Sequence, residues 1–249
     1  MTEESLPADP AASASPAPAS GVMPLLDHLS ELRNRIFKSV LAVLVASGFG
    51  WFAATTVRNY LLDQLPGHKA QVLGPGDAFF IQVKISLTIG VILAMPILLY
   101  QLWAFIAPGL TQAERKTIRP WIPLALLLFA IGVGIAYLVL PFAIAFLLGF
   151  TDNQLVNGIA ATPYFDFVTT LFLAFGLIME FPIVLYGLSL VGVISSAWMS
   201  KNRRMIILGI VAFSAIITPG GDLVSPTVLA ITMYVLTELT RITIKRSGR

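Results

Sequence analysis

Long apolar runs separated by short charged segments dominate the pattern of this 249-residue chain. A run of about 20 apolar residues is enough for one helix to cross the hydrocarbon core of a bilayer. The gaps between charged side chains therefore predict four membrane-spanning helices before residue 201. The predicted runs are residues 39–57, 85–113, 120–151 and the stretch between Asp166 and Lys201, which only Glu180 interrupts.

The last apolar stretch, between Arg204 and Glu238, contains a strong turn signal, TPGGDLVSP, around Asp222. We expect Asp222 to cap the following helix or to stabilise the turn. The signal divides the stretch into short helices at residues 205–217 and 226–240. A helix as short as the first is only about 20 Å long, less than the bilayer core. Two arrangements remain open: two short spans in a locally thinned bilayer, which we favour, or a re-entrant hairpin.

Lysine and arginine are unevenly distributed between the segments that join these runs. Cytoplasmic loops of membrane proteins carry an excess of these residues, so the asymmetry predicts six spans with both termini in the cytoplasm. The segments on the opposite side carry only Arg58, Lys69 and Lys84. The predicted cytoplasmic segments carry Arg33, Arg35 and Lys38; Arg115, Lys116 and Arg119; Lys201, Arg203 and Arg204; and Arg241, Lys245, Arg246 and Arg249.

The composition indicates an all-α integral membrane protein. Hydrophobic residues make up 57% of the chain, charged residues 12%, and the mean hydropathy is +0.84, whereas soluble proteins carry about 25% charged residues. We expect a disordered cytoplasmic tail at residues 1–22, a six-span membrane domain at 23–242 and a basic cytoplasmic tail at 243–249. The N-terminal tail has neither the basic start nor the apolar core of a signal peptide.

The residue types also exclude most catalytic classes. The chain has no cysteine, which excludes disulfides and thiol chemistry, and both histidines, His28 and His68, lie outside the apolar runs. Neither a Gly-x-x-x-x-Gly-Lys-Ser/Thr loop, nor a His-Glu-x-x-His motif, nor a Gly-x-Ser-x-Gly motif occurs. We therefore expect no enzyme activity, no cofactor, no bound metal and no nucleic-acid partner.

Four prolines lie in the predicted spans. Proline removes an intrahelical hydrogen bond and bends the helix, so these residues predict a bent and concave bundle. The alternative is that they change little, because membrane helices tolerate proline. The four residues are Pro96, Pro123, Pro141 and Pro182.

Glu180 is the residue most indicative of function, because it carries the one charge between Asp166 and Lys201. A carboxylate at this depth costs a few kcal/mol, roughly 3 or more, unless a partner compensates it. One interpretation is a structural carboxyl that is protonated or hydrogen-bonded to a neighbouring helix. The other is a docking point for the helix of another protein, or a part of a proton or ion path. Ionisable residues inside membranes are functional by default, which favours the second interpretation.

Two predicted cytoplasmic segments combine apolar and charged residues. Residues 24–38, PLLDHLSELRNRIFK, place apolar residues at helical spacing beside a charged face that includes Glu31 and Arg33. An interfacial anchor is the simple interpretation, although acidic residues are unusual in an anchor. After the second run, Phe105 suits the headgroup level. Glu114 is placed to pair with an arginine of a partner or, alternatively, with its own basic neighbours.

Taken in order, four segments resemble the TatC family, the multispanning subunit of the twin-arginine protein translocase. The resemblance extends from about Leu25 to Ile242. It implies a glove-like bundle with two short last helices, in the cytoplasmic membrane of a bacterium. The segments are HLSELRNRI at His28–Ile36, YQLWAFIAPGLTQAERK at Tyr100–Lys116, FGLIMEFP at Phe175–Pro182 and TPGGDLVS at Thr218–Ser225.

The resemblance also implies a function. A member of this family binds the twin-arginine signal peptides of precursor proteins at the cytoplasmic face. It assembles with single-span subunits of the TatA or TatB type into an oligomeric complex, which exports folded proteins with the energy of the proton gradient. By the same resemblance, Glu180 engages a partner helix within the bilayer, and Asp222 is the family's turn aspartate. The implied signal-peptide-binding residues are Glu31, Arg33, Phe105 and Glu114.

Two further interpretations stay open on the residues alone. An ion- or proton-coupled secondary transporter of a small solute would use Glu180 as a coupling site near the midplane. Such a transporter predicts inverted repeats, and Glu180 has no counterpart in the first half of the chain. A purely structural scaffold predicts that Glu180→Gln leaves export intact.

Overall fold

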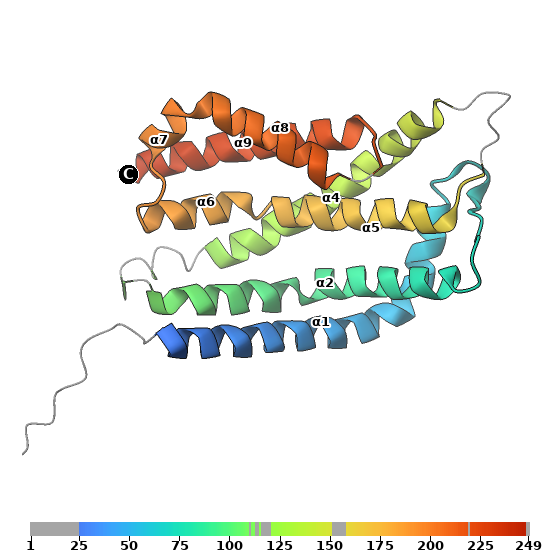
Figure 1. Ribbon diagram of the computed structural model, residues 1–249, viewed down its shortest axis with the longest axis horizontal. Coiled ribbons are helices and arrows are strands. Elements are labelled where there is room, and N and C mark those ends of the chain that lie inside the picture. Colours follow the sequence, from blue (N-terminus) through green and yellow to red (C-terminus); the bar gives the residue numbers. More distant parts are fainter. Residues whose placement is uncertain are drawn as a thin grey trace, which may run out of the picture.

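The computed structural model describes residues 25–109, 111–112, 115, 121–150, 158–218 and 220–247. Every regular element in this part of the chain is a helix, and the β-pairing found there is one isolated bridge between Gln71 and Ala160. The helices, shown in Figure 1, are α1 (Leu25–Leu62), η1 (Pro66–His68), α2 (Asp77–Ile106), η2 (Ala107–Gly109), α4 (Trp121–Leu148), α5 (Ala161–Ile178), α6 (Phe181–Leu190), α7 (Ser196–Lys201), α8 (Arg203–Ile217) and α9 (Val224–Arg246).

Among the described residues, 5 helical stretches are long and apolar enough to cross a membrane. Each of the four runs predicted before residue 201 has its helix among them, which confirms a multi-pass, all-α membrane protein. Helix α8 has 15 residues and is about 22 Å long, shorter than the bilayer core. The stretches are His28–Leu62, Asp77–Gly109, Trp121–Leu148, Ala161–Leu190 and Val224–Arg246.

The last helix is longer than predicted. The charge gap predicted a helix over residues 226–240, but α9 has 23 residues and continues to Arg246. Glu238 does not end this helix, because Arg241 one turn later binds its carboxylate at 2.5 Å. The expectation of two short last helices is therefore correct for α8 and wrong for α9.

Small residues bring α1 and α2 close together along their length. A Cβ atom on Gly50 of α1 would lie 2.6 Å from the carbonyl oxygen of Ser86 in α2, and Gly90 of α2 lies directly against Ser47 of α1. In membranes, such small residues let helix backbones approach and pack closely. As a result α1 and α2 run side by side as a pair (Figure 1).

Helices α4 and α5 also meet at glycines, and this contact leads toward Glu180. A Cβ atom on Gly176 of α5 would lie 2.6 Å from the ring of Phe129 in α4, and Gly132 of α4 faces the backbone of Phe175. Phe175 itself is fully buried. The close packing of α4 on the C-terminal half of α5 therefore fixes the segment that immediately precedes Glu180.

Polar contacts close the end of the bundle where α1 ends and α5 begins. The backbone N–H of Gln71 donates to the carbonyl of Ile159 at 2.7 Å. The buried hydroxyl of Tyr164 donates to the carbonyl of Leu61 at 2.6 Å. These bonds join the loop after α1 to the start of α5, at the right-hand end of Figure 1.

An ion pair inside the membrane-spanning helices joins α2 to α5. Lys84 of α2 binds the carboxylate of Asp166 in α5, and both side chains are about half exposed. The sequence pattern used both residues as the boundaries of apolar runs. In the structure both lie inside their helices, because each charge has the other as a partner.

The predicted proline bends are confirmed at one position. Pro182 is at the start of α6 and coincides with the interruption between α5 and α6. Pro96 lies inside α2 and Pro141 inside α4, and both helices continue across them. Pro123 lies near the beginning of α4, where a missing N–H costs no helical hydrogen bond.

Candidate functional site

Arg35 joins the beginning of α1 to the end of α2. It binds Glu31 one turn earlier, with Nη2 at 2.6 Å and Nε at 3.0 Å from the same carboxylate oxygen. Its Nη1 also donates to the amide oxygen of Gln101 in α2 at 3.2 Å. The three residues hold the two helix ends together at the left of Figure 1. The resemblance did not single out Arg35. Its spacing of four residues from Glu31 is the sequence feature that indicates this ion pair, because residues four apart on a helix are neighbours.

Phe105 belongs to the same seam between the two helices. Its ring stacks on the imidazole of His28, with centroids 4.4 Å apart and planes 17° apart. His28 lies one turn before Glu31 on α1, and Phe105 lies one turn after Gln101 on α2. The structure therefore brings Glu31 and Phe105, two of the residues implied by the resemblance, to one place.

Glu31 and Arg33 have different surroundings. Oε1 of Glu31 is bound by Arg35, whereas its Oε2 is buried and has no hydrogen-bond partner among the described residues. Arg33 is exposed and forms no ion pair with any residue of the described part. Residues two apart on a helix point in different directions, so Arg33 does not share the seam with Glu31.

The loop after α2 is described only in part. Glu114 lies outside the described residues, and the structure does not place its carboxylate. Its neighbour Arg115 donates from Nε to the carbonyl oxygen of Ala107 at 2.5 Å. This bond holds the chain that leaves η2 against the end of α2.

Glu180 lies at the interruption of the membrane-spanning stretch Ala161–Leu190. Helix α5 ends at Ile178 and α6 begins at Phe181, so Glu180 stands about 15 Å from the nearer end of this stretch. Pro182 explains the interruption, because its nitrogen cannot donate a hydrogen bond to the preceding turn. At the interruption, the backbone N–H of Glu180 donates to the carbonyl oxygen of Leu177, three residues earlier, at 3.1 Å.

The carboxyl group of Glu180 has no partner in the described part of the chain. Both of its oxygens are buried, and neither accepts or donates a hydrogen bond there. Its neighbours are apolar side chains of α2 and α6, including Leu98, Leu102 and Val184. Together they form a groove of about 720 Å³ with Glu180 in its wall. A buried polar group without a partner is rare and calls for an explanation.

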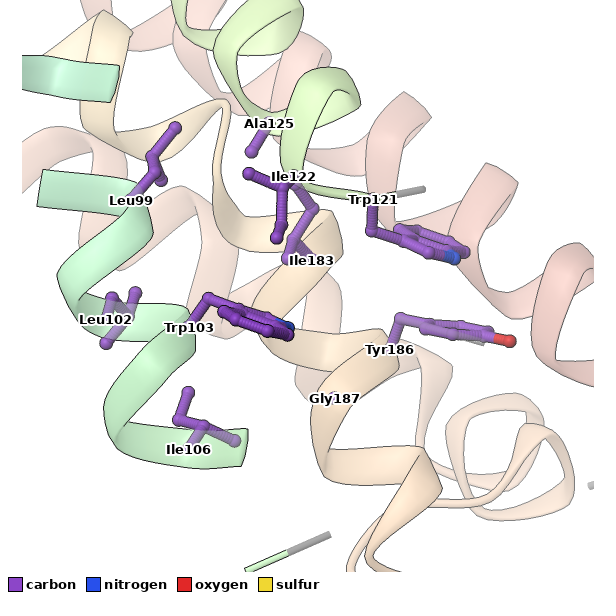
Figure 2. A pocket seen from close by; sticks show the side chains of 10 residues that line it. All are labelled: Leu99, Leu102, Trp103, Ile106, Trp121, Ile122, Ala125, Ile183, Tyr186 and Gly187. Carbon is purple, nitrogen blue, oxygen red and sulfur yellow. The ribbon is translucent and has the colours of Figure 1, made fainter. Parts of the chain in front are cut away.

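Another apolar groove continues the first along α2 toward the C-terminal end of that helix. It has about 570 Å³ of empty space, and it shares Leu99, Leu102 and Ile183 with the Glu180 groove. We call the two together the central groove. Figure 2 shows its outer part between α2, the beginning of α4 and α6. The central groove thus leads from the middle of the bundle to Trp103 and Ile106, at the end of α2 that also carries Phe105, although Phe105 lines neither part of the groove.

Aromatic side chains define the outer part of the central groove. Trp121 of α4 stacks on Tyr186 of α6, with ring centroids 3.9 Å apart and planes 13° apart. Trp103 of α2 lies across from this stack (Figure 2), and its Nε1 is buried without a hydrogen-bond partner among the described residues. The sequence pattern does not predict the stacked pair, because Trp121 and Tyr186 lie on different helices.

Asp222 has the local role that the turn signal predicted. Its Oδ1 accepts a hydrogen bond from the backbone N–H of Ser225 at 2.6 Å, in the first turn of α9. The side chain is buried, and Oδ2 has no partner in the described part. Asp222 does not line the central groove, so the structure does not bring it together with Glu180.

These features define a class of protein: a multi-pass α-helical membrane protein with a long apolar groove that contains one carboxyl group. The described residues contain no group of three or more His, Cys, Asp or Glu side chains that could hold a metal ion. Comparison with known proteins identifies the family. The family model of the Sec-independent protein translocase protein (TatC) matches residues 27–231, and the chain belongs to this family.

Individual relatives agree over most of their length. TatC of Aquifex aeolicus is 38% identical over 228 residues, which cover 87% of this chain and 92% of the relative. TatCy of Bacillus subtilis is 31% identical over 231 residues, 91% of each chain. A crystal structure described as twin arginine translocase receptor TatC matches with a TM-score of 0.75 and 37% identity, over 89% of this chain and 100% of the other. The family consists of protein-transport components of a translocase and not of enzymes.

Proposed function

We propose that this chain is the receptor for twin-arginine signal peptides in a translocase that exports folded proteins across the bacterial cytoplasmic membrane, driven by the proton gradient. The observation that carries this proposal is the central groove, which leads from Glu180 along α2 to the end of the helix that also carries Phe105 of the seam. A signal peptide has a basic start followed by an apolar segment. The seam offers acidic and aromatic side chains, and the central groove offers an apolar path.

The proposal includes six spans with both termini in the cytoplasm. Helix α8 is then a short span, around which the bilayer thins locally. The beginning of α1, the end of α2 and the end of α9 all lie at one end of the bundle (Figure 1), which supports this topology. Lysines and arginines are concentrated at this end, as the positive-inside rule requires.

We assign the arginine pair of the signal peptide to Glu31 and Glu114, with Phe105 beside them. Oε2 of Glu31 is unpaired in the described part, and it accepts a charge-assisted hydrogen bond from an incoming guanidinium. Arg35 already binds the other oxygen and keeps the carboxylate in place. Arg33, which faces away from the seam, contacts the outer edge of the bound precursor.

We assign Glu180 to a helix of a single-span subunit of the TatA or TatB type within an oligomeric complex. A polar group on that helix supplies the hydrogen bond that the carboxyl lacks. Asp222 supports the same complex indirectly, because it holds the turn between α8 and α9.

Site-specific photo-crosslinking tests the receptor role. A crosslinker at Leu102, which lines the central groove, is expected to capture a precursor with an arginine pair and not the same precursor with a lysine pair. A crosslinker at Leu138, an exposed residue of α4 that lines neither part of the central groove, is the control. Equal capture at both positions would remove the central groove from the proposal.

The role of Glu114 needs its own experiment. Glu114→Ala and Glu114→Arg are expected to reduce capture of a twin-arginine precursor, with the charge reversal having the larger effect. Unchanged capture in both variants would remove Glu114 from the site and leave Glu31 as the carboxylate that meets the arginines.

The unpartnered carboxyl of Glu180 also fits a coupling site in a transporter of a small solute. A transporter would work without other subunits or precursors, whereas a receptor requires a precursor. Solute uptake by the purified chain in vesicles, without other subunits or precursors, would favour the transporter. Precursor-dependent crosslinking without such uptake favours the receptor.

A further inference from the structure

A groove between α1 and α2 has a lysine among the residues that line it. It has about 760 Å³ of empty space, within the usual range of ligand sites. We call it the α1 groove. Lys38 lines it together with apolar side chains of α1 and α2, and no other described helix contributes to its lining. The site therefore consists of an apolar channel with one cation.

The residues of α1 that line the α1 groove follow one face of the helix. Lys38, Ala42 and Val45 are three or four positions apart, which is the spacing of neighbours on a helix surface. Phe49 follows one turn later. From Lys38 to Phe49 this face extends for about 16 Å, roughly half of the bilayer core of about 30 Å. Lys38 is also the last charged residue before the apolar run at 39–57, so the α1 groove covers the depth of one leaflet, from the headgroups to the midplane.

Small side chains leave this space open. Ala42 and Ala46 of α1 are half-buried and Ala94 of α2 is buried, so methyl groups form the floor of the α1 groove. Val45 and Leu93 are larger, and each is about half exposed. An acyl chain that fills the groove gains van der Waals contacts with this floor.

The α1 groove belongs to the part of the bundle that is most open to lipid. Helix α1 packs along α2, and no other described helix makes an extensive contact with it. Figure 1 shows α1 at one edge of the bundle. Only 11% of the α1 span is buried, against 22% or more in each of the other candidate spans. Lipid is therefore what meets this face when the chain is alone in a bilayer.

Lys38 brings an uncompensated positive charge to the α1 groove. Its side chain is exposed and forms no ion pair with any residue that the structure describes. Arg35, one turn earlier, is different, because Glu31 and Gln101 bind its guanidinium. The same ion pair neutralises Glu31, the nearest described acid before Lys38 on α1. An anionic group is therefore the partner that Lys38 lacks in the described part of the chain.

We propose that the α1 groove binds one anionic phospholipid, such as phosphatidylglycerol. Its phosphate lies beside Lys38, and one acyl chain lies over Ala42 and Ala46 toward Phe49. Basic pockets between membrane helices are known to hold such headgroups. The proposed topology places Lys38 in the cytoplasmic leaflet, whose surface carries anionic lipids. The site needs only a bilayer around α1 and α2, so it does not depend on the proposed receptor function.

A photo-crosslinker at Val45 of the full-length protein tests the headgroup. In nanodiscs with equal amounts of phosphatidylglycerol and phosphatidylcholine, it is expected to capture phosphatidylglycerol about fivefold more often, which is the effect of one surface base. A crosslinker at Leu44 is the control, because this neighbour is exposed to a similar extent but does not line the α1 groove. It is expected to capture both lipids equally. The same ratio at both positions overturns the proposal, because Lys38 would then attract lipid without a site.

Charge variants test the role of Lys38. Lys38→Gln is expected to reduce the lipid ratio at Val45 to the ratio at Leu44, and Lys38→Arg is expected to retain the preference. Lys201→Gln removes the same charge from another exposed lysine, which does not line the α1 groove, and it is expected to keep the wild-type ratio. A preference that survives Lys38→Gln, or an equal loss in Lys201→Gln, overturns the proposal.

Filling the groove tests the acyl chain. Ala42→Phe is expected to reduce phospholipid capture at Val45 several-fold. Gly134→Phe places the same side chain at an exposed glycine of α4 that has free space around it, and it is expected to leave capture unchanged. Circular dichroism verifies that both variants are folded, and Ala42→Leu replaces Ala42→Phe if the larger side chain prevents folding. Equal capture in the two variants overturns the proposal.

Crosslinking at Val45 in whole cells distinguishes a lipid from a protein in the α1 groove. Mass spectrometry of the crosslinked chain is expected to identify a phospholipid as the main adduct. A precursor protein or a single-span subunit as the main adduct overturns the proposal, because a helix of that protein would then occupy the groove.

Discussion

Asp166 and Glu180 are two acids on the same membrane-spanning stretch, yet their surroundings differ. Asp166 lies in α5 and binds Lys84 of α2. Glu180 lies between α5 and α6, with both carboxyl oxygens buried and without a partner among the described residues. The contacts among the described residues explain only the first acid. A charge in a span that has a partner in the same bundle is explained by that partner. The acid without a partner among the described residues is the candidate for contact with another protein.

The energetics of the two acids differ accordingly. A charged group inside a bilayer costs about 3 kcal/mol on insertion scales, and an ion pair offsets this cost for both of its members. Lys84 and Asp166 therefore contribute to the arrangement of α2 and α5. Glu180 has no such compensation in the described part, so its burial lowers the stability of the chain.

The largest expected effect follows from breaking the ion pair. Asp166→Leu leaves Lys84 without its partner, and we expect the free energy of unfolding in micelles to fall by about 2 kcal/mol, less than the cost at the bilayer centre because both side chains are about half exposed. Adding Lys84→Met removes the remaining charge and should restore stability to within about 1 kcal/mol of the wild type. A double variant as unstable as Asp166→Leu would show that the pair does not explain the presence of Asp166.

Glu180→Gln should behave in the opposite way. The substitution keeps the shape and replaces one buried polar group without a partner by another, so the free energy of unfolding should not fall by more than about 1 kcal/mol. Export of a twin-arginine precursor, measured per amount of folded protein, should fall roughly tenfold, equivalent to about 1.4 kcal/mol. Normal export would support the scaffold interpretation, whereas a large loss of stability would show that Glu180 is structural like Asp166.

The central groove can be filled without touching either acid. Gly187 lines its outer part, and a Cβ atom there meets nothing within 4 Å. Gly187→Phe should leave stability unchanged to within about 1 kcal/mol and should reduce precursor crosslinking at Leu102 several-fold. Gly134→Phe, which leaves the central groove open, is the matched control. Similar crosslinking in both variants would separate the central groove from precursor binding.

Asp222 is a third buried acid, intermediate between the other two, because one of its oxygens is bonded and the other is not. Asp222→Ala removes the cap of α9 and should reduce the free energy of unfolding by about 1 kcal/mol. Asp222→Asn keeps an oxygen for the N–H of Ser225 and should cost only a few tenths, about 0.3 kcal/mol. Equal losses in both variants would show that the charge of Asp222, and not its role as a cap, stabilises the turn.

Charge gaps were a good guide to where spans lie and a poor guide to where helices end. The pattern treated Asp166 and Glu238 as boundaries, but both lie inside helices. Each is paired, with Lys84 and Arg241 respectively. A paired charge is tolerated within a helix near the membrane surface, so hydropathy alone shortens such helices.

The sequence by itself determined the class of the protein, the family, the positions of the spans and the isolation of Glu180, because these depend on residue types and on spacing along one chain. It also determined the turn at Asp222 and the interruption at Pro182, where the local backbone chemistry is decisive. Only the tertiary structure decided which acids are compensated. Lys84 and Asp166 are separated by 82 positions, and Arg35 reaches Gln101 across 66. The central groove likewise arises only where separate helices pack together, and no local pattern encodes the space between them.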